Sequence, residues 1–452
     1  MAGTRIASVS GLRGVVGDGL DPAIVADFTA AYASGLAAGP IVVGHDGRVS
    51  APVFLPAVLS AITATGRDAW LAGPVATPTL GRLVFDLNAA GGIQISASHN
   101  PPKYNGLKFF QPGGMVLGPI EGRAMLDRLE ARALDWATWD RLGKVRVLDE
   151  PDGQHLALVL ATVDVELIRR QKFVVVLDAC HGSGGRLGET LLRELGCDPV
   201  VLGAVPDGRY DHPPEPTEAN LRRFSPVVTA LGAAVGFAQD PDADRLAIVD
   251  ETGRYIGEEL TLALAASHRL SQTRGVVVLN LSTSKATEDI AEKFGCPVIR
   301  TPVGEIHVVE GMRAHSAVLG GEGNGGVIDP RVGYVRDSFA AMALVLDLLA
   351  KTGRKLSELV DELPRYALIK DQYPIGSNSG VPELFDRIAA GHPEAKADRR
   401  DGLRLDWSDR WVHVRSSNTE PIVRVIAEAG DPQSARSLAD QIGRQVAGRT
   451  SP

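Results

Sequence analysis

The sequence predicts the α/β fold class: three consecutive α/β domains with mainly parallel, mixed sheets and a smaller C-terminal α+β domain, arranged around a central cleft. Three valine-rich runs, at residues 41–43, 174–177 and 276–279, are each followed by a polar loop and a helical pattern. The runs are continuous rather than alternating, which is typical of strands buried on both faces of a parallel sheet. Beyond residue 364 short strands mix with helices, which favours an α+β domain.

The length of 452 residues is enough for three or four domains, because a single hydrophobic core rarely grows beyond about 250 to 300 residues. We expect the domain limits at residues 1–152, 153–251, 252–364 and 365–452. The polar loops after the valine-rich runs lie at the carboxyl ends of the predicted strands, where open α/β sheets bind ligands.

Charge and composition narrow the function classes. The formal net charge is −8 without a block of lysine or arginine, so we expect neither nucleic acid nor a membrane as a partner. The scattered cysteines Cys180, Cys197 and Cys296 indicate neither a disulfide framework nor a zinc site. Neither a signal-peptide pattern nor an apolar run of about 18 residues occurs. We expect a cytoplasmic protein, either a monomer or a homodimer.

Capping residues mark the helix starts of the α/β part. Asp and Ser side chains accept hydrogen bonds from the first free amides of a helix, and proline is favoured in the first turn. Helices are predicted after Asp21 with Pro22, after Ser50 with Pro52, and over residues 339–349 after Asp337 or Ser338.

The residues beyond Pro364 carry the pattern of the separate α+β domain. The polar, charged stretch 389–401 predicts an exposed loop within it. Strands are predicted over residues 366–370, 403–406, 411–414 and 421–428, and helices over residues 382–390 and 431–446.

Three aspartates with a spacing of two, Asp240, Asp242 and Asp244, follow an apolar, β-prone segment. Pro241 lacks a backbone donor and has a fixed φ, so the carboxylates lie on a loop rather than a helix. Three carboxylates without a soft ligand favour Mg²⁺, Mn²⁺ or Ca²⁺ over zinc. Their charge exceeds that of the ion, so we expect Arg245 to offset the excess or to bind the same phosphate.

Two other interpretations fit these residues. Together with Glu251, the aspartates occupy positions one, three, five and twelve of an EF-hand calcium loop. This interpretation is disfavoured because Arg245 stands where that loop needs glycine, and because residues 246–249 indicate a strand. A solvated acidic turn is the second alternative.

A second loop, residues 96–102, reads Ser-Ala-Ser-His-Asn-Pro-Pro. Asn-Pro-Pro continues neither a helix nor a central strand, so the turn presents Ser98 and His99 at a rigid tip. Ser98 is a candidate nucleophile, and as a phosphoserine it is a natural partner for a metal on the aspartates. Lys108 could transfer a proton or neutralise a transferring phosphoryl group. Taken singly, Ser98 and Lys108 would be ordinary turn and surface residues.

A third stretch, residues 415–421 with Arg424 after it, combines two guanidinium groups with hydroxyls and loop amides. Guanidinium forks match the geometry of phosphate oxygens, so this composition predicts a phosphate cradle. The alternative is a polar turn between a strand and a loop.

A fourth stretch, residues 320–326, places Glu322 and Asn324 among five glycines. Glycines let the backbone approach a ligand closely, and the two polar side chains could bind vicinal hydroxyls. We call this stretch the sugar loop. The alternative is a flexible hairpin turn.

Together these stretches resemble the α-D-phosphohexomutase family, whose members move a phosphoryl group between positions 1 and 6 of a hexose. The resemblance runs nearly end to end and keeps the family's order. The serine and metal loops are highly specific when they occur together. The matching motifs are SGLRG (10–14, beginning at Ser10), VGHDGR (43–48), SASHNPPKYNGLK (96–108), DPDADR (240–245), TPVGE (301–305), GEGNGG (321–326) and RSSNTEPIVR (415–424).

The resemblance implies a phosphorylated Ser98, Mg²⁺ bound by Ser98 and the three aspartates, and a hexose 1,6-bisphosphate as activator or primer. It places Lys108 and Arg13 around the transferring phosphoryl group, and His99 either assists proton transfer or fixes the loop. With the chemistry of the residues, it predicts that the phosphosugar substrate is bound by Arg245, Glu305, Glu322, Asn324, Arg415, Ser416, Ser417, Asn418, Thr419 and Arg424.

The implied reaction interconverts hexose 6-phosphate and hexose 1-phosphate through the 1,6-bisphosphate. The sugar loop departs from the common Glu-Ser-His pattern, because Asn324 replaces the serine and Gly326 the histidine. Glu305 resembles the phosphoglucosamine mutase branch, and an acid near the sugar could pair with a 2-ammonium group. We therefore expect glucosamine phosphate as substrate, with phosphomannomutase or phosphoglucomutase activity as the alternative. A Mg²⁺-dependent sugar phosphatase and a non-catalytic sugar-phosphate binder stay open outside the class.

Overall fold

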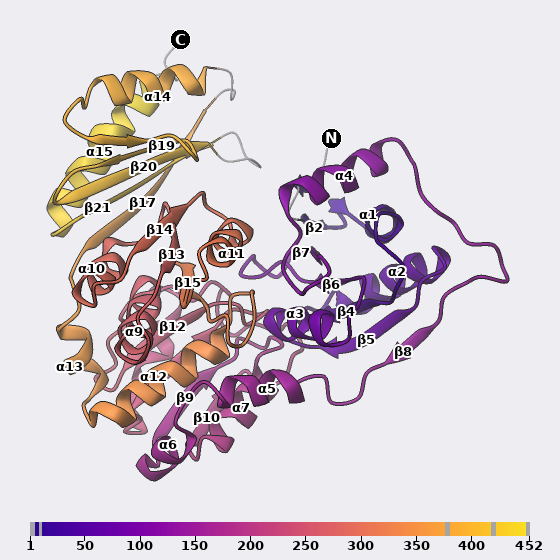
Figure 1. Ribbon diagram of the computed structural model, residues 1–452, viewed down its shortest axis with the longest axis horizontal. Coiled ribbons are helices and arrows are strands. Elements are labelled where there is room, and N and C mark those ends of the chain that lie inside the picture. Colours follow the sequence, from indigo (N-terminus) through magenta and orange to yellow (C-terminus); the bar gives the residue numbers. More distant parts are fainter. Residues whose placement is uncertain (1–4, 9–10, 376–379, 417–421, 449–452) are drawn as a thin grey trace.

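The computed structural model describes residues 5–8, 11–375, 380–416 and 422–448. These residues form four sheets that follow one another along the chain (Figure 1). The first three sheets are mixed and carry helices, and the fourth is antiparallel, so the predicted fold class is confirmed. Within the described residues, no helix is both long and apolar enough to cross a membrane.

The first sheet has eight strands, in the order β1-β2-β7-β6-β4-β5-β8, with β3 beside β2. Strand β4 is parallel to both of its neighbours, β5 and β6, and this central place explains its continuous apolar sequence. The elements are β1 (Arg5–Ser8), β2 (Gly11–Val16), β3 (Gly19–Leu20), α1 (Pro22–Ser34), β4 (Ile41–His45), α2 (Ala51–Ala64), β5 (Ala69–Pro74), α3 (Thr77–Asp86), β6 (Gly91–Ile95), β7 (Tyr104–Phe110), α4 (Pro119–Glu130) and β8 (Val145–Val147).

The second sheet has the order β10-β9-β11-β12. Strands β10, β9 and β11 are parallel, whereas β12 runs antiparallel to β11. Residues 240–245 form the tight connection between β11 and β12. The elements are α5 (Gly153–Leu160), α6 (Val165–Gln171), β9 (Val174–Asp178), α7 (Gly185–Glu194), β10 (Asp198–Leu202), a 3₁₀ turn (Leu221–Arg223), α8 (Ser225–Ala230), β11 (Val235–Gln239) and β12 (Leu246–Asp250).

The third sheet repeats this plan with the order β14-β13-β15-β16, and only β16 of its strands is antiparallel to its neighbour. The sugar loop spans the end of β15, the turn and the start of β16. The elements are α9 (Glu258–Gln272), β13 (Val277–Asn280), α10 (Lys285–Lys293), β14 (Val298–Thr301), α11 (Glu305–Ala314), β15 (Leu319–Glu322), β16 (Gly326–Ile328), α12 (Ser338–Thr352) and α13 (Leu356–Asp361).

Helix α12 joins the second and third sheets into one core. Asp337 caps it by accepting hydrogen bonds from the amides of Phe339 and Ala340, as the sequence predicts. The helix packs against α5 and α6 on one side and α9 on the other. One apolar cluster therefore contains Leu177 of β9, Leu262 of α9 and Phe339 of α12. The domain limits at 152, 251 and 364 stay a prediction.

The fourth sheet is antiparallel, with the order β17-β21-β20-β19-β18. The four strands and two helices predicted beyond residue 364 are present. The prediction of a loop over residues 389–401 was wrong in part, because Lys396–Asp398 form the short edge strand β18, whose sequence has no apolar residue besides Ala397 to signal it. The elements are β17 (Ala367–Pro374), α14 (Val381–Ala390), β18 (Lys396–Asp398), β19 (Leu403–Asp406), β20 (Arg410–Ser416), β21 (Ile422–Ala429) and α15 (Pro432–Ala447).

The fourth sheet has a core of its own and meets the third sheet through polar contacts. Its apolar cluster contains only residues from 369 onward. Figure 1 shows it lying above α10 and β14. Ser282 Oγ lies 2.8 Å from His413 Nδ1, the Lys285 amide donates to Glu428 at 2.8 Å, and the Arg404 guanidinium donates to the carbonyl of Leu281.

Candidate active site

Ser98 lies in the connection between β6 and β7, with its backbone in the left-handed region at φ 49°. Its side chain is buried, and its Oγ donates to Asp240 Oδ2 at 2.7 Å. The serine loop and the acidic loop, 142 positions apart in sequence, are therefore in direct contact.

Arg48, which follows β4, holds the serine loop in place. It is fully buried and paired with Asp46 at 3.0 Å, and Asp46 also accepts a hydrogen bond from Ser96 Oγ at 2.7 Å. Ser96 Oγ in turn accepts the Ser98 amide at 2.8 Å. The hydrogen bonds that involve the charged Arg48 and Asp46 are stronger than bonds between neutral groups. The Arg48 guanidinium donates to the carbonyls of Ser98, Asn100, Pro101 and Tyr104.

Asp240, Asp242 and Asp244 form a compact acidic triad. One carboxylate oxygen from each lies within 4.8 Å of the others, and all three side chains are fully buried. Asp240 Oδ1 accepts the amides of Asp244 and Arg245 at 3.2 Å. Within the described residues, Oδ1 of Asp242 and Oδ1 of Asp244 are buried without a hydrogen-bond partner. Orphaned hard oxygens on three carboxylates fit a divalent cation such as Mg²⁺.

The two alternative interpretations of this loop fail. Glu251 does not point back to the triad, because both of its carboxylate oxygens are bonded to Ser357. Residues 246–250, within the twelve positions of such a loop, form strand β12, and strand β11 precedes the loop where an EF-hand has a helix. A solvated acidic turn is excluded by the complete burial of the triad.

Two cations from distant parts of the chain donate hydrogen bonds to the triad. Lys108 Nζ, on β7, donates to Asp242 at 3.0 Å and to Asp244 at 2.9 Å. Burial alone would lower the pKa of Lys108, but the two aspartates outweigh it and raise the pKa, so the ammonium form is favoured. Arg336, which precedes α12, donates to Asp244 Oδ2 at 2.6 Å.

The three aspartates differ in their affinity for protons. Burial, and then the neighbouring Asp242 and Asp244, raise the pKa of Asp240 well above its usual range. Burial would also raise the pKa of Asp244, but the charges of Arg336 and Lys108 outweigh it and lower the pKa. Thr77, at the start of α3, donates to Asp242 Oδ2 at 2.6 Å, which fixes this carboxylate from the first sheet.

Other predicted site residues surround Ser98. Arg13, on β2, donates to Asn100 Oδ1 at 3.0 Å, and Arg245 Nε lies 3.8 Å from Asp244 Oδ1. His99 Nδ1 lies 3.4 Å from Ser98 Oγ. The charge of Arg245, together with burial and Arg13, holds the pKa of His99 well below its usual range, so the imidazole is neutral near pH 7.

The sugar loop is a buried hairpin turn bonded to the acidic loop. Gly325 accepts the amide of Leu246 at 3.0 Å, and a Cβ at position 325 would lie 2.4 Å from the Leu246 carbonyl oxygen. Its φ of 83° also requires glycine. Asn324 Oδ1 accepts the Gly326 amide at 3.2 Å. The residues after the triad and the sugar loop are therefore held side by side.

Glu322 and Glu305 both bind Arg336. Glu322 Oε2 accepts from its Nη1 at 2.6 Å, while Oε1 accepts from Asn280 Nδ2 at 2.7 Å and from the Gly304 amide at 3.2 Å. Glu305 Oε1 accepts the Arg336 amide at 2.8 Å, and its Oε2 lies 3.5 Å from the guanidinium Nε. Glu305 is therefore already next to a cation of this chain.

The predicted phosphate cradle lies on the fourth sheet. Arg415 of β20 and Arg424 of β21 are directly opposite each other in the register of the two strands. Two guanidinium groups on neighbouring strands fit the binding of an anion by charge and by their planar forks. Arg415 Nε lies 3.3 Å from Asp401. Ser416 ends β20. Outside the described residues lie the predicted Ser417, Asn418 and Thr419, and also Ser10 of the first motif.

Sequence reasoning missed Arg336, Arg48 as the anchor of the serine loop, and Thr77. Arg48 lies in a recognised motif, but its role depends on carbonyls some 50 residues away. Arg336 lies ten residues beyond the sugar loop, and its signal is a lone arginine directly before the helix cap Asp337. A buried arginine needs carboxylate partners. An arginine directly before an apolar helix therefore predicts a buried ion pair, and this signal was present in the sequence.

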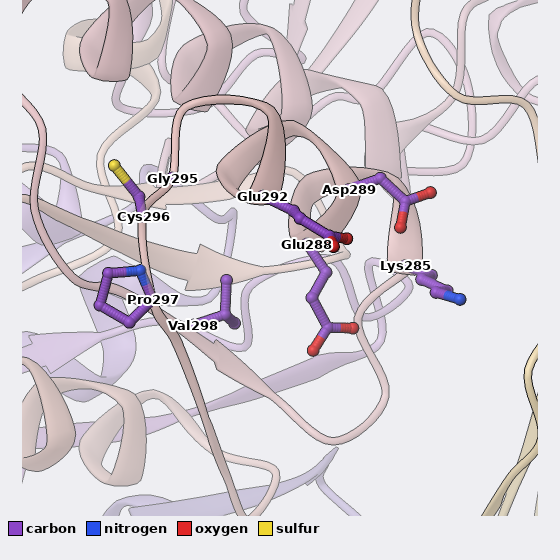
Figure 2. Close-up of a pocket in the computed structure, with 8 residues that line it drawn as sticks. All are labelled: Lys285, Glu288, Asp289, Glu292, Gly295, Cys296, Pro297 and Val298. Carbon is purple, nitrogen blue, oxygen red and sulfur yellow. The ribbon is translucent and has the colours of Figure 1, made fainter.

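A surface pocket of about 550 Å³ between α10 and β14 does not belong to this site (Figure 2). It contains none of the predicted site residues. Glu288 in it is paired with Arg300 at 2.8 Å, and Asp289 accepts from Tyr366 at 2.5 Å. Glu288 thus joins α10 to β14, and Asp289 bonds the residue directly before β17.

Comparisons with known proteins agree with this arrangement. In chain order, the sequence matches the phosphoglucomutase/phosphomannomutase alpha/beta/alpha domains I (residues 4–133), II (154–253) and III (257–366) and the C-terminal domain (378–445). It is 37% identical over 440 residues to a phosphoglucomutase/phosphomannomutase of Thermococcus kodakarensis, covering 95% of this chain and 96% of that protein.

Two further comparisons extend the likeness. A probable phosphoglucosamine mutase of Methanopyrus kandleri is 35% identical over 436 residues, covering 96% of this chain and 95% of that protein. The crystal structure of a phosphoglucomutase/phosphomannomutase family protein from Burkholderia thailandensis superimposes with a TM-score of 0.85 at 25% identity, covering 98% of this chain and 97% of the other. The chain belongs to the phosphoglucomutase/phosphomannomutase family.

Proposed function

We propose that the protein is a phosphohexomutase in which Ser98 carries the phosphoryl group between positions 1 and 6 of a hexose phosphate. The observation that carries this proposal is the contact of Ser98 Oγ with Asp240 at 2.7 Å, inside a buried triad that Lys108 also faces. Ser98 Oγ lies next to a candidate cation site. A phosphate on this oxygen would therefore be stabilised by the positive charge of the bound ion.

In the first half-reaction, the phosphoserine P–O bond breaks and a bond forms from phosphorus to the free hydroxyl oxygen of the substrate. Ser98 Oγ leaves with the electron pair of the broken bond and takes up the proton that the attacking hydroxyl loses, so that Ser98 becomes a free hydroxyl. The 1,6-bisphosphate turns round, and the reverse transfer from its other phosphate restores the phosphoserine. Both half-reactions depend on positioning and charge neutralisation, because the transition state of phosphoryl transfer is loose.

The residues of the triad and its surroundings would supply that neutralisation. Asp240, Asp242 and Asp244 would hold Mg²⁺, which supplies charge stabilisation for the transferring phosphoryl group. Lys108 and Arg13 would bind phosphoryl oxygens from the first sheet. We assign His99 to fixing the serine loop rather than to acid catalysis, because its lowered pKa disfavours the imidazolium form that acts as an acid near pH 7.

The rest of the substrate would be bound by the third and fourth sheets. Glu322 and Asn324 would accept hydroxyl hydrogens of the sugar in either orientation. The opposed Arg415 and Arg424 would bind the distal phosphate through charge and shape, so that the cradle accepts the 1-phosphate and the 6-phosphate alike. Arg245, Glu305, Ser416, Ser417, Asn418 and Thr419 complete this proposed set.

Glucosamine phosphate is the sugar substrate that we propose, with a hexose 1,6-bisphosphate as primer. The Methanopyrus kandleri relative is named as a probable phosphoglucosamine mutase, which supports this choice. One observation favours phosphomannomutase or phosphoglucomutase activity as the second candidate: Glu305 already lies beside Arg336, so its charge is balanced without a 2-ammonium group. The Thermococcus kodakarensis relative carries that second name.

The deciding experiment measures turnover of purified protein with glucosamine, mannose, glucose and N-acetylglucosamine phosphates, each primed with its 1,6-bisphosphate. Ser98→Ala should abolish isomerisation while circular dichroism stays unchanged, because this turn residue fills no apolar core. The exposed helix serine in Ser60→Ala is the matched control and should keep full turnover. Equal turnover by Ser98→Ala would refute the role of this residue.

The same assay separates the two rival classes. A Mg²⁺-dependent sugar phosphatase would release one inorganic phosphate for each sugar phosphate consumed, and a non-catalytic binder would show no turnover with any sugar. Asp242→Asn should weaken the binding of Mg²⁺ in calorimetry together with turnover. Mg²⁺ affinity equal to that of the unmodified protein would exclude the triad as its site.

A further inference from the structure

We propose that Arg336 is a positioning residue that holds the sugar loop and the acidic triad at a fixed distance from each other. This inference rests on the phosphohexomutase activity proposed above. One guanidinium donates to Asp244 Oδ2 and to Glu322 Oε2, both at 2.6 Å. Asp244 belongs to the triad and Glu322 to the sugar loop. Arg336 thus ties together the two loops that would hold the metal and the sugar.

The chemistry of an arginine suits this task. Arg336 is buried, and its planar fork meets three carboxylates, those of Asp244, Glu322 and Glu305. A buried cation is tolerated only when it is paired, and a rigid fork fixes the angle between two partners, which a flexible ammonium group does not. The contact therefore sets geometry as well as charge.

The bridge also orients the oxygens that face the site. Asp244 Oδ2 accepts from Arg336 and Lys108, whereas Oδ1 has no hydrogen-bond partner among the described residues and only the longer ion-pair contact with Arg245 at 3.8 Å. Glu322 is bound through both oxygens, to Arg336 on one side and to Asn280 and Gly304 on the other. Two carboxylates of the proposed site are thereby held in single orientations before substrate arrives.

The backbone of Arg336 is anchored by its neighbour. The Asp337 amide donates to Val327 of β16 at 2.8 Å. Its carboxylate caps α12 through Oδ1, and Oδ2 lies 2.8 Å from His155 Nε2. His155 Nδ1 in turn lies 2.8 Å from Thr79 Oγ1 on α3. Strand β16 and helices α5 and α3 all contribute to the position of this short segment, so the bridge does not depend on one loop alone.

Gly326 supplies an independent observation. A Cβ at this position would lie 2.2 Å from Arg336 Cδ, so only glycine leaves room for the arginine stem. Gly326 is also the place where the sugar loop departs from the histidine common in the family. The small residue and the arginine are complementary, which indicates that the loop of this chain is built around the Arg336 bridge.

The test combines two variants that disturb the bridge in different ways. Arg336→Lys keeps the charge but loses the fork, and Gly326→Ala keeps the arginine but displaces its stem. Both should lower kcat/KM by about 10- to 100-fold, the size seen when a group that orients a site is removed. Hydrogen exchange of the amides in residues 320–326 should become at least about tenfold faster. If Arg336→Lys does not fold, Gly326→Ala decides alone.

Matched controls lie in the same segment. Arg331→Lys changes an arginine that pairs with Asp329 and donates to the Thr162 carbonyl rather than to the triad or the sugar loop. Gly333→Ala adds a methyl group with nothing within 4 Å. Both should keep kcat/KM and exchange within about twofold of the unmodified protein. Glu322→Gln combined with Arg336→Lys should be no worse than the more damaging single variant, because the two residues act as a unit.

Three outcomes would overturn the inference: unchanged kcat/KM in either bridge variant, unchanged exchange in the sugar loop, or strictly additive losses in the double variant. A loss of thermal stability with full kcat/KM would likewise reduce Arg336 to a structural ion pair. Turnover of the unmodified protein tests the proposed function separately. If the unmodified protein turns over no phosphosugar, that function fails, while hydrogen exchange still reports on the bridge.

Discussion

The second and third sheets share an apolar core, whereas the third and fourth sheets meet through separate polar contacts. Helix α12 is buried between the first pair, and side chains from both sheets belong to one cluster. At the other interface, the Lys285 amide meets Glu428 and Ser282 meets His413. A shared core cannot open without exposing apolar area, but each hydrogen bond contributes only about 0.5–1.5 kcal/mol net and can be exchanged for water.

This difference assigns different mechanical roles to the two regions. The acidic triad and the sugar loop lie on the shared core and should keep their separation. Arg415 and Arg424 lie on the fourth sheet, whose polar interface should let it move relative to the shared core. A bisphosphate that must reorient in the site needs a mobile phosphate cradle on the fourth sheet. It also needs a fixed reacting centre at the acidic triad. Closure would also exclude water from the phosphoserine.

Phe339→Ala should have the largest effect of the four substitutions that test this comparison. The ring is fully buried in the shared core and makes an edge contact with His155. Its removal should cost about 3–5 kcal/mol of the free energy of unfolding, measured by urea denaturation. The second and third sheets should still unfold in one transition.

The matched control is Phe85→Ala, since Phe85 is 53% exposed. It should cost less than about 1 kcal/mol. Separate transitions for the second and third sheets in Phe339→Ala would contradict a common core.

Arg404→Ala should loosen the polar interface. The guanidinium is buried, stacks on Trp411 at 4.0 Å and donates to the Leu281 carbonyl across the interface. Its loss should destabilise the fourth sheet by about 1.5–3 kcal/mol, as expected for a charged hydrogen bond. The fourth sheet should then unfold before the rest, which limited proteolysis can detect.

Arg399→Ala serves as the control, because this exposed residue pairs with Asp386 inside the fourth domain. It should leave protease resistance unchanged. Resistance of Arg404→Ala equal to that of the control would show that the polar contacts do not hold this interface.

Arg415→Ala should act on substrate binding rather than on the chemistry at Ser98. Removing one guanidinium from the opposed pair should raise KM for the hexose phosphate by about 10- to 100-fold, the equivalent of one charged hydrogen bond. The value of kcat should change less than KM. Arg410→Ala, at the other end of β20, is the control and should leave both constants unchanged. An unaltered KM in Arg415→Ala would remove the cradle from the proposal.

The smallest effect should be a pH dependence of the polar interface. Burial lowers the pKa of His413 to about 4, whereas an unfolded histidine has a pKa of about 6.5. Between these values the unfolded state binds the proton and the folded state does not. The free energy of unfolding should therefore be highest above about pH 6.5, where His413 is neutral in both states. It should fall as the pH decreases, by about 1.4 kcal/mol at pH 5.5.

The contribution of this histidine can be isolated by substitution. His413→Gln should flatten the slope between about pH 6.5 and 4, while the exposed His315→Gln should keep it. A slope in His413→Gln equal to that of the unmodified protein would assign the effect to other groups.

The sequence predicted the parts of this molecule whose signals are local. The apolar runs at β4, β9 and β13 indicated buried strands because every residue in them is apolar, and the loops after β6 and β11 stood out because they concentrate reactive side chains. Strand β18 has no such signal, since Lys396 and Asp398 read as loop and the strand forms only through pairing with β19.

Contacts between distant segments were not predictable in the same way. The position of Ser98 beside Asp240 was expected from the chemistry of the two loops, but nothing local linked Arg336 to Glu322 or Thr77 to Asp242. The shared core was also missed. Helix α12 reads as apolar on nearly all sides, and such a pattern indicates burial without naming the partners.

The shared core also has a consequence for synthesis on the ribosome. The second sheet is complete in sequence at Asp250, but one wall of its core is α12, which ends at Thr352. The emerging second sheet must therefore keep apolar side chains exposed until the whole third segment has left the exit tunnel. This interval is where a chaperone would be needed most. The fourth domain has a core of its own, so its folding does not depend on the core that the second and third sheets share.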